Sequence, residues 1–314
     1  IGNQSGYNNT TGYGNIFIGR SGGCNNTTGY RNVRIGYENM GSLTDTGSKS
    51  IGHNTGTEVA RDDTLDTIDI SQDNIEIGIG AGANNTNGNS NIFIGVNAGK
   101  FNKYSDKNVF LGFSAGQFNN VSQTGTSSQN TFIGYKAGQC NDEGECNVFL
   151  GVEAGANNSN ANNNVFLGTE SGRYNNLGNS NVFVGVQAGI SNTSGHRNVF
   201  MGYLAGGSNE QGDDNVFLGT EAGRYNNNGQ SNVCIGYRAG ISNRNKDNNV
   251  IIGTEAAMQN VNGTNNTVFG NKAAYNMGTS STRTKYNIIV GEKAGYTGDT
   301  FKDNIFLGYK AGYG

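Results

Sequence analysis

The stretch that decides the fold is Asn147-Val-Phe-Leu-Gly-Val-Glu-Ala-Gly155, because versions of it recur along nearly the whole chain. The consensus is Asn-Val-Phe-Leu-Gly-x-x-Ala-Gly-x-x-Asn-x-x-Gly-x-x, and its residues are numbered below as positions 1 to 17. From Asn91 onward the units follow one another every 17 residues, except after Asn108 (22 residues) and Asn266 (21 residues). A fixed period of this kind is the signature of a repeat protein.

The repeat predicts short strands that stack along one axis. Positions 2 and 4 are apolar and alternate around position 3, as in a strand. Position 8 is Ala from Ala81 onward, with Ser171 the exception, so two walls must lie close together. The chain has no Pro, which indicates backbone N–H groups committed to hydrogen bonds. We expect an all-β parallel β-solenoid of the β-roll type, with about 18 coils of two short strands and two turns each, about 4.8 Å apart.

The repeat also predicts the domain organisation and the corners. Residues 1–314 are expected to form a single continuous solenoid domain, irregular over residues 1–90 and regular over residues 91–314. The chain opens on Ile1 rather than Met, and we expect it to be a fragment of a longer protein. The glycines suit corners that need positive φ, and Asn, which tolerates the left-handed region, suits the remaining corners.

Composition excludes several classes of protein. Gly (52) and Asn (53) fill a third of the chain, and 33% of residues are hydrophobic. Disorder usually brings high net charge and few aromatic residues, whereas this chain has a net charge of −3 with fifteen Phe and fifteen Tyr. Without a basic excess we expect no nucleic-acid partner. No stretch approaches 18 apolar residues, so we expect no membrane insertion.

The segment 147–155 resembles the "N-T-A-L-G-x-x-A" repeats of phage tail-fibre proteins, many of which end in an intramolecular chaperone of the endosialidase type. It is also similar to the heads of trimeric autotransporter adhesins, whose shorter repeats carry an Ile-Gly motif on a left-handed parallel β-roll. The resemblance covers essentially the whole chain. It implies an extracellular homotrimeric fibre used for surface attachment.

Position 3 is the expected interface of that trimer. If positions 2 and 4 point into the coil, position 3 points out and forms one apolar stripe. Because Arg34, Ser50 and Glu76 interrupt the stripe, we expect the subunits to splay, rearrange or be covered differently there. The interface candidates are Phe93, Phe110, Phe132, Phe149, Phe166, Phe183, Phe200, Phe217, Ile251 and Phe306.

Three insertions lengthen the coils at one corner, over residues 57–73, 117–129 and 275–286. Insertions in solenoids collect on one face, often the binding face, and loops carry recognition more readily than scaffolds. Tolerated decoration is the alternative. The candidates for contact with a host receptor or glycan are Asp62, Asp63, Asp66, Val121, Thr124, Thr126, Arg283 and Lys285.

No motif for catalysis, cofactor binding or metal binding is found, and we expect no enzyme, cofactor or metal site. His53 and His196 have no motif partner and are interpreted as solvated turn residues. The acidic run over residues 58–69 matches no calcium loop and is interpreted as solvated. The spacing of Cys140 and Cys146 allows a local disulfide in an oxidising compartment, and two free thiols are the equal alternative.

The leading functional hypothesis is the shaft or head of a viral tail fibre that binds a host surface. A bacterial trimeric surface adhesin and a cell-surface appendage scaffold are the alternatives. The expected location is therefore extracellular or on the virion surface, with the bacterial cell surface as the alternative. Ice binding is disfavoured because the Thr column formed by Thr169, Thr220 and Thr254 is interrupted by Val and Tyr.

Overall fold

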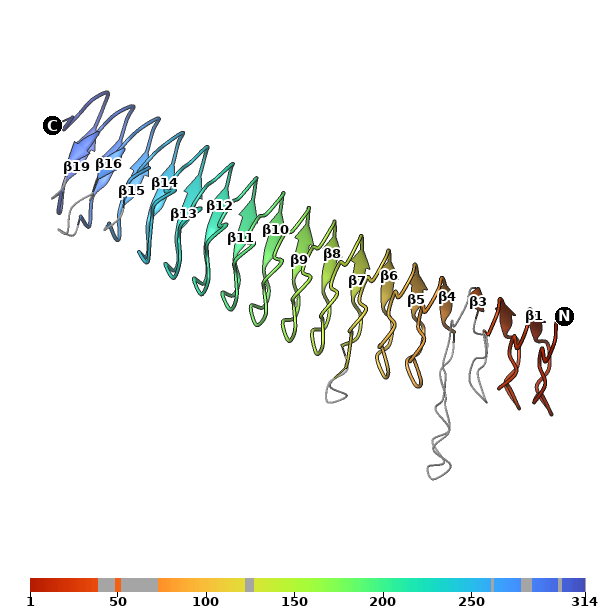
Figure 1. The fold of residues 1–314 in the computed structure, drawn as a ribbon. Helices are drawn as coiled ribbons and strands as arrows, with labels where there is room; N and C mark the ends of the chain where they lie inside the picture. Colours follow the sequence, from red (N-terminus) through yellow and green to blue (C-terminus); the bar gives the residue numbers. More distant parts are fainter. Residues whose placement is uncertain are drawn as a thin grey trace. The chain divides into compact units, whose positions relative to one another are not determined.

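The structure is a computed structural model that describes residues 1–38, 49–51, 73–121, 127–260, 263–277, 284–298 and 301–313. These residues form strands, bridges and turns, and no helix is found among them. They belong to two compact units, Ile1–Asn160 and Ala161–Gly314. Each unit is a parallel β-solenoid, in which successive coils contribute successive strands (Figure 1).

Within each unit every three-residue strand pairs in parallel with the strand of the next coil. The first unit holds β1 (Ile16–Ile18), β2 (Val33–Ile35), β3 (Lys49–Ile51), β4 (Ile75–Ile77), β5 (Ile92–Ile94), β6 (Val109–Leu111), β7 (Thr131–Ile133) and β8 (Val148–Leu150). The second unit holds β9 (Val165–Leu167), β10 (Val182–Val184), β11 (Val199–Met201), β12 (Val216–Leu218), β13 (Val233–Ile235), β14 (Val250–Ile252), β15 (Thr267–Phe269), β17 (Ile288–Val290) and β19 (Ile305–Leu307). A second parallel pair, β16 (Asn276–Met277) with β18 (Thr297–Gly298), joins the coil of β15 to the coil of β17.

The register follows the 17-residue repeat, so each position lies over the same position of the next coil. Phe183 pairs with Phe200, for example, and Val182 with Val199. The predicted parallel solenoid and its period are therefore confirmed, with slightly fewer strands in the two sheets than the expected 18 coils. The expected two strands per coil are wrong for most coils: one strand alternates with turns, and only β16 and β18 add a second wall of strand.

The predicted direction of position 3 is wrong. The eight Phe side chains from Phe93 to Phe217 are completely buried within the chain, as are Ile251 and Ile289. Positions 2 and 4 instead face outward: Leu150 is 47% and Met201 44% exposed. The alternation of the strand is as predicted, but the inward and outward faces are exchanged. The wall opposite the strand carries small residues, and the coil has room for one large inward side chain per strand, at position 3, rather than two, at positions 2 and 4.

Positions 8 and 9 form that opposite wall. The Ala residues at position 8 are fully buried. Gly206, at position 9, has φ +58°, and a Cβ there would lie 2.5 Å from the ring of Phe200. Ring centroids of successive Phe residues then stack 4.8–5.2 Å apart, as for Phe183 on Phe200 (4.8 Å). The core of each unit is therefore an aromatic column enclosed by a glycine and alanine wall.

The N-terminal coils replace part of this column with an ion pair. Arg34 and Glu76 occupy position 3 and are 2% and 4% exposed, with Nη1 of Arg34 4.0 Å from Oε2 of Glu76. We expected polar residues here to disturb an interface between subunits. They lie inside the coil instead, where the two opposite charges are buried close to one another.

Two ladders of Asn complete the core. At position 12, Nδ2 of Asn209 donates to Oδ1 of Asn192 (2.8 Å) and to the carbonyl of Gly212 (3.0 Å), and Asn226 repeats the contact one coil on (2.9 Å). At position 1, Oδ1 of each Asn accepts the backbone N–H of the next, as Asn198 does from Asn215 (2.9 Å). The Asn residues of these two ladders are not among the residues with positive φ, so the expectation that Asn occupies left-handed corners is wrong for positions 1 and 12. It holds at position 7 for Asn97 and at position 17 for Asn163, Asn248 and Asn265.

The left-handed corners lie at other positions. Gly at position 5 has φ near +135°, and a Cβ on Gly168 would lie 2.5 Å from the carbonyl oxygen of Gly185. Positions 7 and 17 are left-handed too, yet they hold side chains such as Leu204 (φ +53°) and Arg197 (φ +55°). Each coil thus carries backbone strain that its ladders must offset.

Candidate interaction surfaces

The outer face of each sheet is apolar over its whole described length. Positions 2 and 4 are occupied by Val, Ile, Leu, Met, Phe or Thr in every described strand except at Lys49. Several of these side chains are more than a third exposed: Ile16, Ile18, Ile77, Ile133, Val148, Leu150, Met201, Val250, Phe269, Ile288, Ile305 and Leu307. Soluble monomers rarely expose contiguous apolar patches of more than a few hundred Å², and here exposed apolar side chains recur in coil after coil of both units.

Position 6 continues this surface beyond the corner glycine. It carries exposed aromatic residues in several coils, among them Tyr203 and Tyr237. The guanidinium of Arg238 lies 5.0 Å from the ring centroid of Tyr237, and Phe113 stacks on Tyr135 at 5.5 Å. Aromatic and cationic side chains therefore border the aliphatic face, as they border many protein interfaces.

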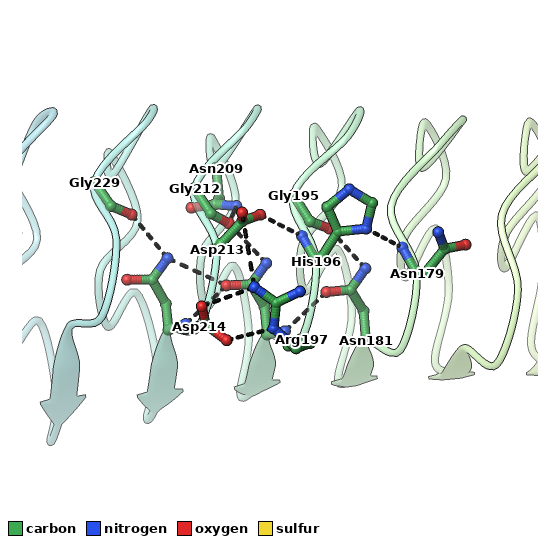
Figure 2. Close-up of polar contacts among 12 residues, drawn as sticks. Asn179, Asn181, Gly195, His196, Arg197, Asn209, Gly212, Asp213, Asp214 and Gly229 are labelled. Carbon is green, nitrogen blue, oxygen red and sulfur yellow. Dashed lines mark hydrogen bonds and ion pairs between the residues drawn. The ribbon is translucent and has the colours of Figure 1, made fainter.

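A polar ladder runs along positions 16 and 17 of the second unit (Figure 2). Nδ1 of His196 accepts the backbone N–H of Asn179 (2.9 Å), and the N–H of His196 donates to Asp213 (2.7 Å). Arg197 donates from Nε and Nη2 to the two carboxylate oxygens of Asp214 (2.6 and 2.9 Å). The hydrogen bond from Arg197 lowers the pKa of Asp214. Each contact joins neighbouring coils, so His196 has a structural role: it is half-buried and hydrogen-bonded to both neighbours rather than a solvated turn residue.

Over four successive coils of the second unit, position 7 carries a ladder of alternating charge. Glu221 accepts hydrogen bonds from Arg224 of its own coil and from Arg238 of the next, both at 2.5 Å. Burial acts to raise the pKa of Glu221, but the two guanidinium groups outweigh it and the pKa is lowered. Lys272 pairs with Glu255 (3.4 Å). The sign therefore alternates from Glu221 through Arg238 and Glu255 to Lys272.

The predicted interface residues do not form a surface. Phe306 is partly buried in the last coil, and the other nine candidates of position 3 are enclosed within the chain, so none of those nine can contact a partner while the coils remain intact. The outward residues that the sequence reasoning missed are those at positions 2 and 4, on either side of position 3. A signal in the sequence could have found them: where position 3 shrinks to Ile251 or Val268, position 9 grows from Gly to Ala257 or Ala274.

The predicted receptor loops are only partly described. Asp62, Asp63, Asp66, Thr124, Thr126 and Arg283 lie outside the described residues. Val121 is 47% exposed at the edge of one insertion. The backbone of Lys285 forms isolated parallel β-bridges with Thr264 and Lys302, and its ammonium lies 5.4 Å from the ring centroid of Tyr286. Val121 belongs to the first unit and Lys285 to the second, and the role of all eight candidates stays a prediction.

Cys140 and Cys146 are free thiols in this structure, so the disulfide that their spacing allows is not formed. Partial burial raises the pKa of Cys140 although Lys136 opposes it, and Cys146 donates to Gln129 (3.3 Å). Cys234 replaces Phe at position 3, is fully buried, and has its pKa raised by that burial.

Within the described ranges no group of three or more His, Cys, Asp or Glu side chains is placed to hold a metal ion. Among the same residues there is no helix long and apolar enough to cross a membrane. Comparison of the chain with protein families, with curated proteins and with solved structures finds no match.

Proposed function

We propose that this chain is a structural domain of an extracellular attachment fibre and that it associates with copies of itself through the outer face of its sheets. The observation that carries the proposal is the apolar surface formed by positions 2 and 4. A shaft or head of a viral tail fibre is the leading assignment, and a bacterial surface adhesin or appendage scaffold is the second. The chain acts by shape and contact rather than by catalysis.

The size of the face supports self-association. A stable protein interface needs roughly 800 Å² from each partner. Two outward apolar side chains per coil reach that requirement within a part of either unit, because the face repeats in each described coil. Two sheets can pack face to face with interdigitating side chains at about 10 Å.

The regularity of the face favours a second copy over an unrelated partner. The apolar side chains of the face repeat once per coil, and the same face of a second copy has the same spacing from coil to coil. Copies related by closed symmetry cover the face without open-ended aggregation. The number three comes from the resemblance to tail fibres and trimeric adhesins, and the variable insertions supply the receptor or glycan contacts in this proposal.

Light scattering on the whole chain tests the proposal. We expect a trimer near 99 kDa, three times 33.0 kDa. Replacing Leu167 and Leu218 by Asp should dissociate it to a folded monomer, because charges would be buried in the interface. Gln211→Asp, at an exposed tip away from the sheet, is the matched control and should stay trimeric. A soluble wild-type monomer of 33 kDa would refute self-association.

A further inference from the structure

The last three coils of the second unit depart from the alternating charges of position 7. Lys272, Lys293 and Lys310 occupy this position in successive coils, and the backbone N–H of each donates to the preceding coil (2.9, 2.9 and 3.0 Å). Like charges placed directly opposite one another in neighbouring strands are destabilising. Because the same column alternates in sign from Glu221 to Lys272, this run of lysines is not required by the fold.

Three tyrosines accompany the lysines at position 10. Tyr275 stacks on Tyr296 and Tyr296 on Tyr313, with centroids 5.2 Å apart in both pairs. The ammonium of Lys272 lies 6.0 Å from the ring centroid of Tyr275, and that of Lys310 lies 5.2 Å from the centroid of Tyr313. The six residues make a continuous strip, called the Lys–Tyr strip below.

The backbone that carries the first two tyrosines of the strip leads into paired strands, whereas the other described coils of the unit have turns here. Directly after Tyr275 and Tyr296 the chain forms β16 and β18, the only described strands outside the main sheets. The strand pair fixes the spacing of the strip at one coil, about 4.8 Å. Rigid placement lowers the entropic cost of binding a ligand.

Charge points to an anionic ligand. Residues 264–314 hold six basic and three acidic residues, a net charge of +3, whereas the whole chain carries −3. Two acidic side chains lie at the strip: Glu255 pairs with Lys272 (3.4 Å), and Glu292 lies 4.0 Å from Lys293. They offset part of the charge, but Lys310 has no acidic partner among the ion pairs of the described residues.

The geometry favours a polysaccharide over a nucleic acid. Binding of single strands relies on free aromatic faces on which bases stack. Here the facing sides of the three tyrosine rings cover one another, and Tyr296 is stacked on both of its faces, so the strip offers ring edges and hydroxyl groups rather than a free face for each base. An extended sugar chain advances by about one coil spacing per ring, offering carboxylate or sulfate groups to the lysines and hydroxyl groups to the tyrosines.

We propose that the Lys–Tyr strip binds an acidic polysaccharide that runs along the solenoid axis. The proposal deepens the attachment function proposed above by naming the class of ligand, and it rests on that function. The ammonium of Lys310 also lies 5.2 Å from the ring centroid of Tyr309, at the border of the aliphatic sheet face. The mass of each variant by light scattering therefore has to accompany the binding measurement, so that loss of binding and loss of self-association are told apart.

Calorimetric titration of the whole chain with polygalacturonate and with heparin tests the proposal, with neutral dextran and a single-stranded DNA oligonucleotide for comparison. We expect at least one acidic polysaccharide to bind, with an affinity that falls as salt is raised. The triple variant Lys272→Gln, Lys293→Gln, Lys310→Gln should weaken that binding at least tenfold. The matched control Lys100→Gln, Lys103→Gln, Lys107→Gln removes the same charge from the first unit and should bind as wild type.

A second variant separates binding from folding. Lys293→Glu restores alternating charge at position 7, so it should raise the melting temperature by about 1–3 °C while abolishing binding. Light scattering on each variant should give the wild-type mass. The proposal is overturned if neither polysaccharide binds at low salt, if both triple variants weaken binding equally, if DNA binds as tightly as polysaccharide, or if Lys293→Glu binds normally.

Discussion

At the scale of single residues, position 9 shows how closely the core is matched to its wall. Gly206 faces Phe200 at a distance that leaves no room for a Cβ, whereas Ala257 and Ala274 face the smaller Ile251 and Val268. Both alanines keep a positive φ, +45° and +53°. The size of the core residue therefore limits which residue fits opposite it, although the small Cys234 and Ile289 also have Gly at position 9 of their coils.

This match predicts coupling between two substitutions. Gly206→Ala alone should destabilise the chain by about 2–3 kcal/mol, because the new methyl group overlaps the Phe200 ring in a left-handed backbone. Phe200→Ile alone leaves a cavity and should cost about 1–2 kcal/mol. Thermal unfolding of both single variants and the double variant should show a favourable coupling of about 1 kcal/mol or more. Strictly additive costs would contradict the proposed contact.

The Asn ladders predict a substitution whose cost depends on pH. Asn209→Asp replaces the Nδ2 donor by a carboxylate in a fully buried ladder, facing the oxygen of Asn192 and the carbonyl of Gly212. Burial and these acceptors should raise the folded-state pKa of the new carboxyl above its unfolded value of about 3.9.

The variant should therefore lose about 2–4 kcal/mol at pH 7, with the loss shrinking as pH falls through the raised pKa and the carboxyl regains a proton to donate. Melting temperatures of the variant and wild type between pH 4 and pH 8 provide the measurement. A deficit that does not depend on pH would contradict the buried ladder.

At the scale of the element, each coil is joined to the next by a strand, two Asn ladders and, in places, ion pairs. Glu221 is the most connected charged residue of position 7, with Arg224 and Arg238 on its carboxylate. Its pKa is lowered in the folded state. The resulting stability is present above the ordinary value of 4.5 and is lost as pH falls through the lower folded value.

Acid should therefore weaken this part of the second unit. We expect the melting temperature of wild type to fall between pH 5 and pH 3, and Glu221→Gln to show a smaller fall because its side chain does not titrate. Glu210→Gln, an exposed tip residue, is the control and should follow wild type. An identical acid response in the Glu221 variant would show that the pair with Arg238 does not contribute.

The element scale is also where the sequence is most and least informative. Spacing and residue type alone predict three features: the period, the strand at positions 2 to 4, and the positive φ of the glycines at repeat positions 5 and 9. The direction of the strand faces does not follow from the alternation, because both faces are apolar; only the change from Gly to Ala at position 9 in the coils of Ile251 and Val268 indicates which face is inside. The left-handed residues at positions 7 and 17 have no signal of their own, since Glu, Lys, Arg and Leu are not typical there.

At the scale of the whole molecule, both units obey one rule. Each coil contacts its neighbours through the same columns, so stability accumulates along each stack, as in other repeat proteins. The inner columns are polar and aromatic, and the outer face of the sheet is aliphatic. This distribution leaves an apolar surface that grows with the number of coils, and it is the physical basis of the proposed fibre.

Two adjacent substitutions test this distribution most directly. Phe200→Asp places a charge in the core, and Met201→Asp places one on the outer face. Circular dichroism and light scattering on the two variants should show that Phe200→Asp loses folded structure and that Met201→Asp stays folded but dissociates to a monomer of 33.0 kDa. A folded monomer for Phe200→Asp, together with an undisturbed assembly for Met201→Asp, would contradict the account.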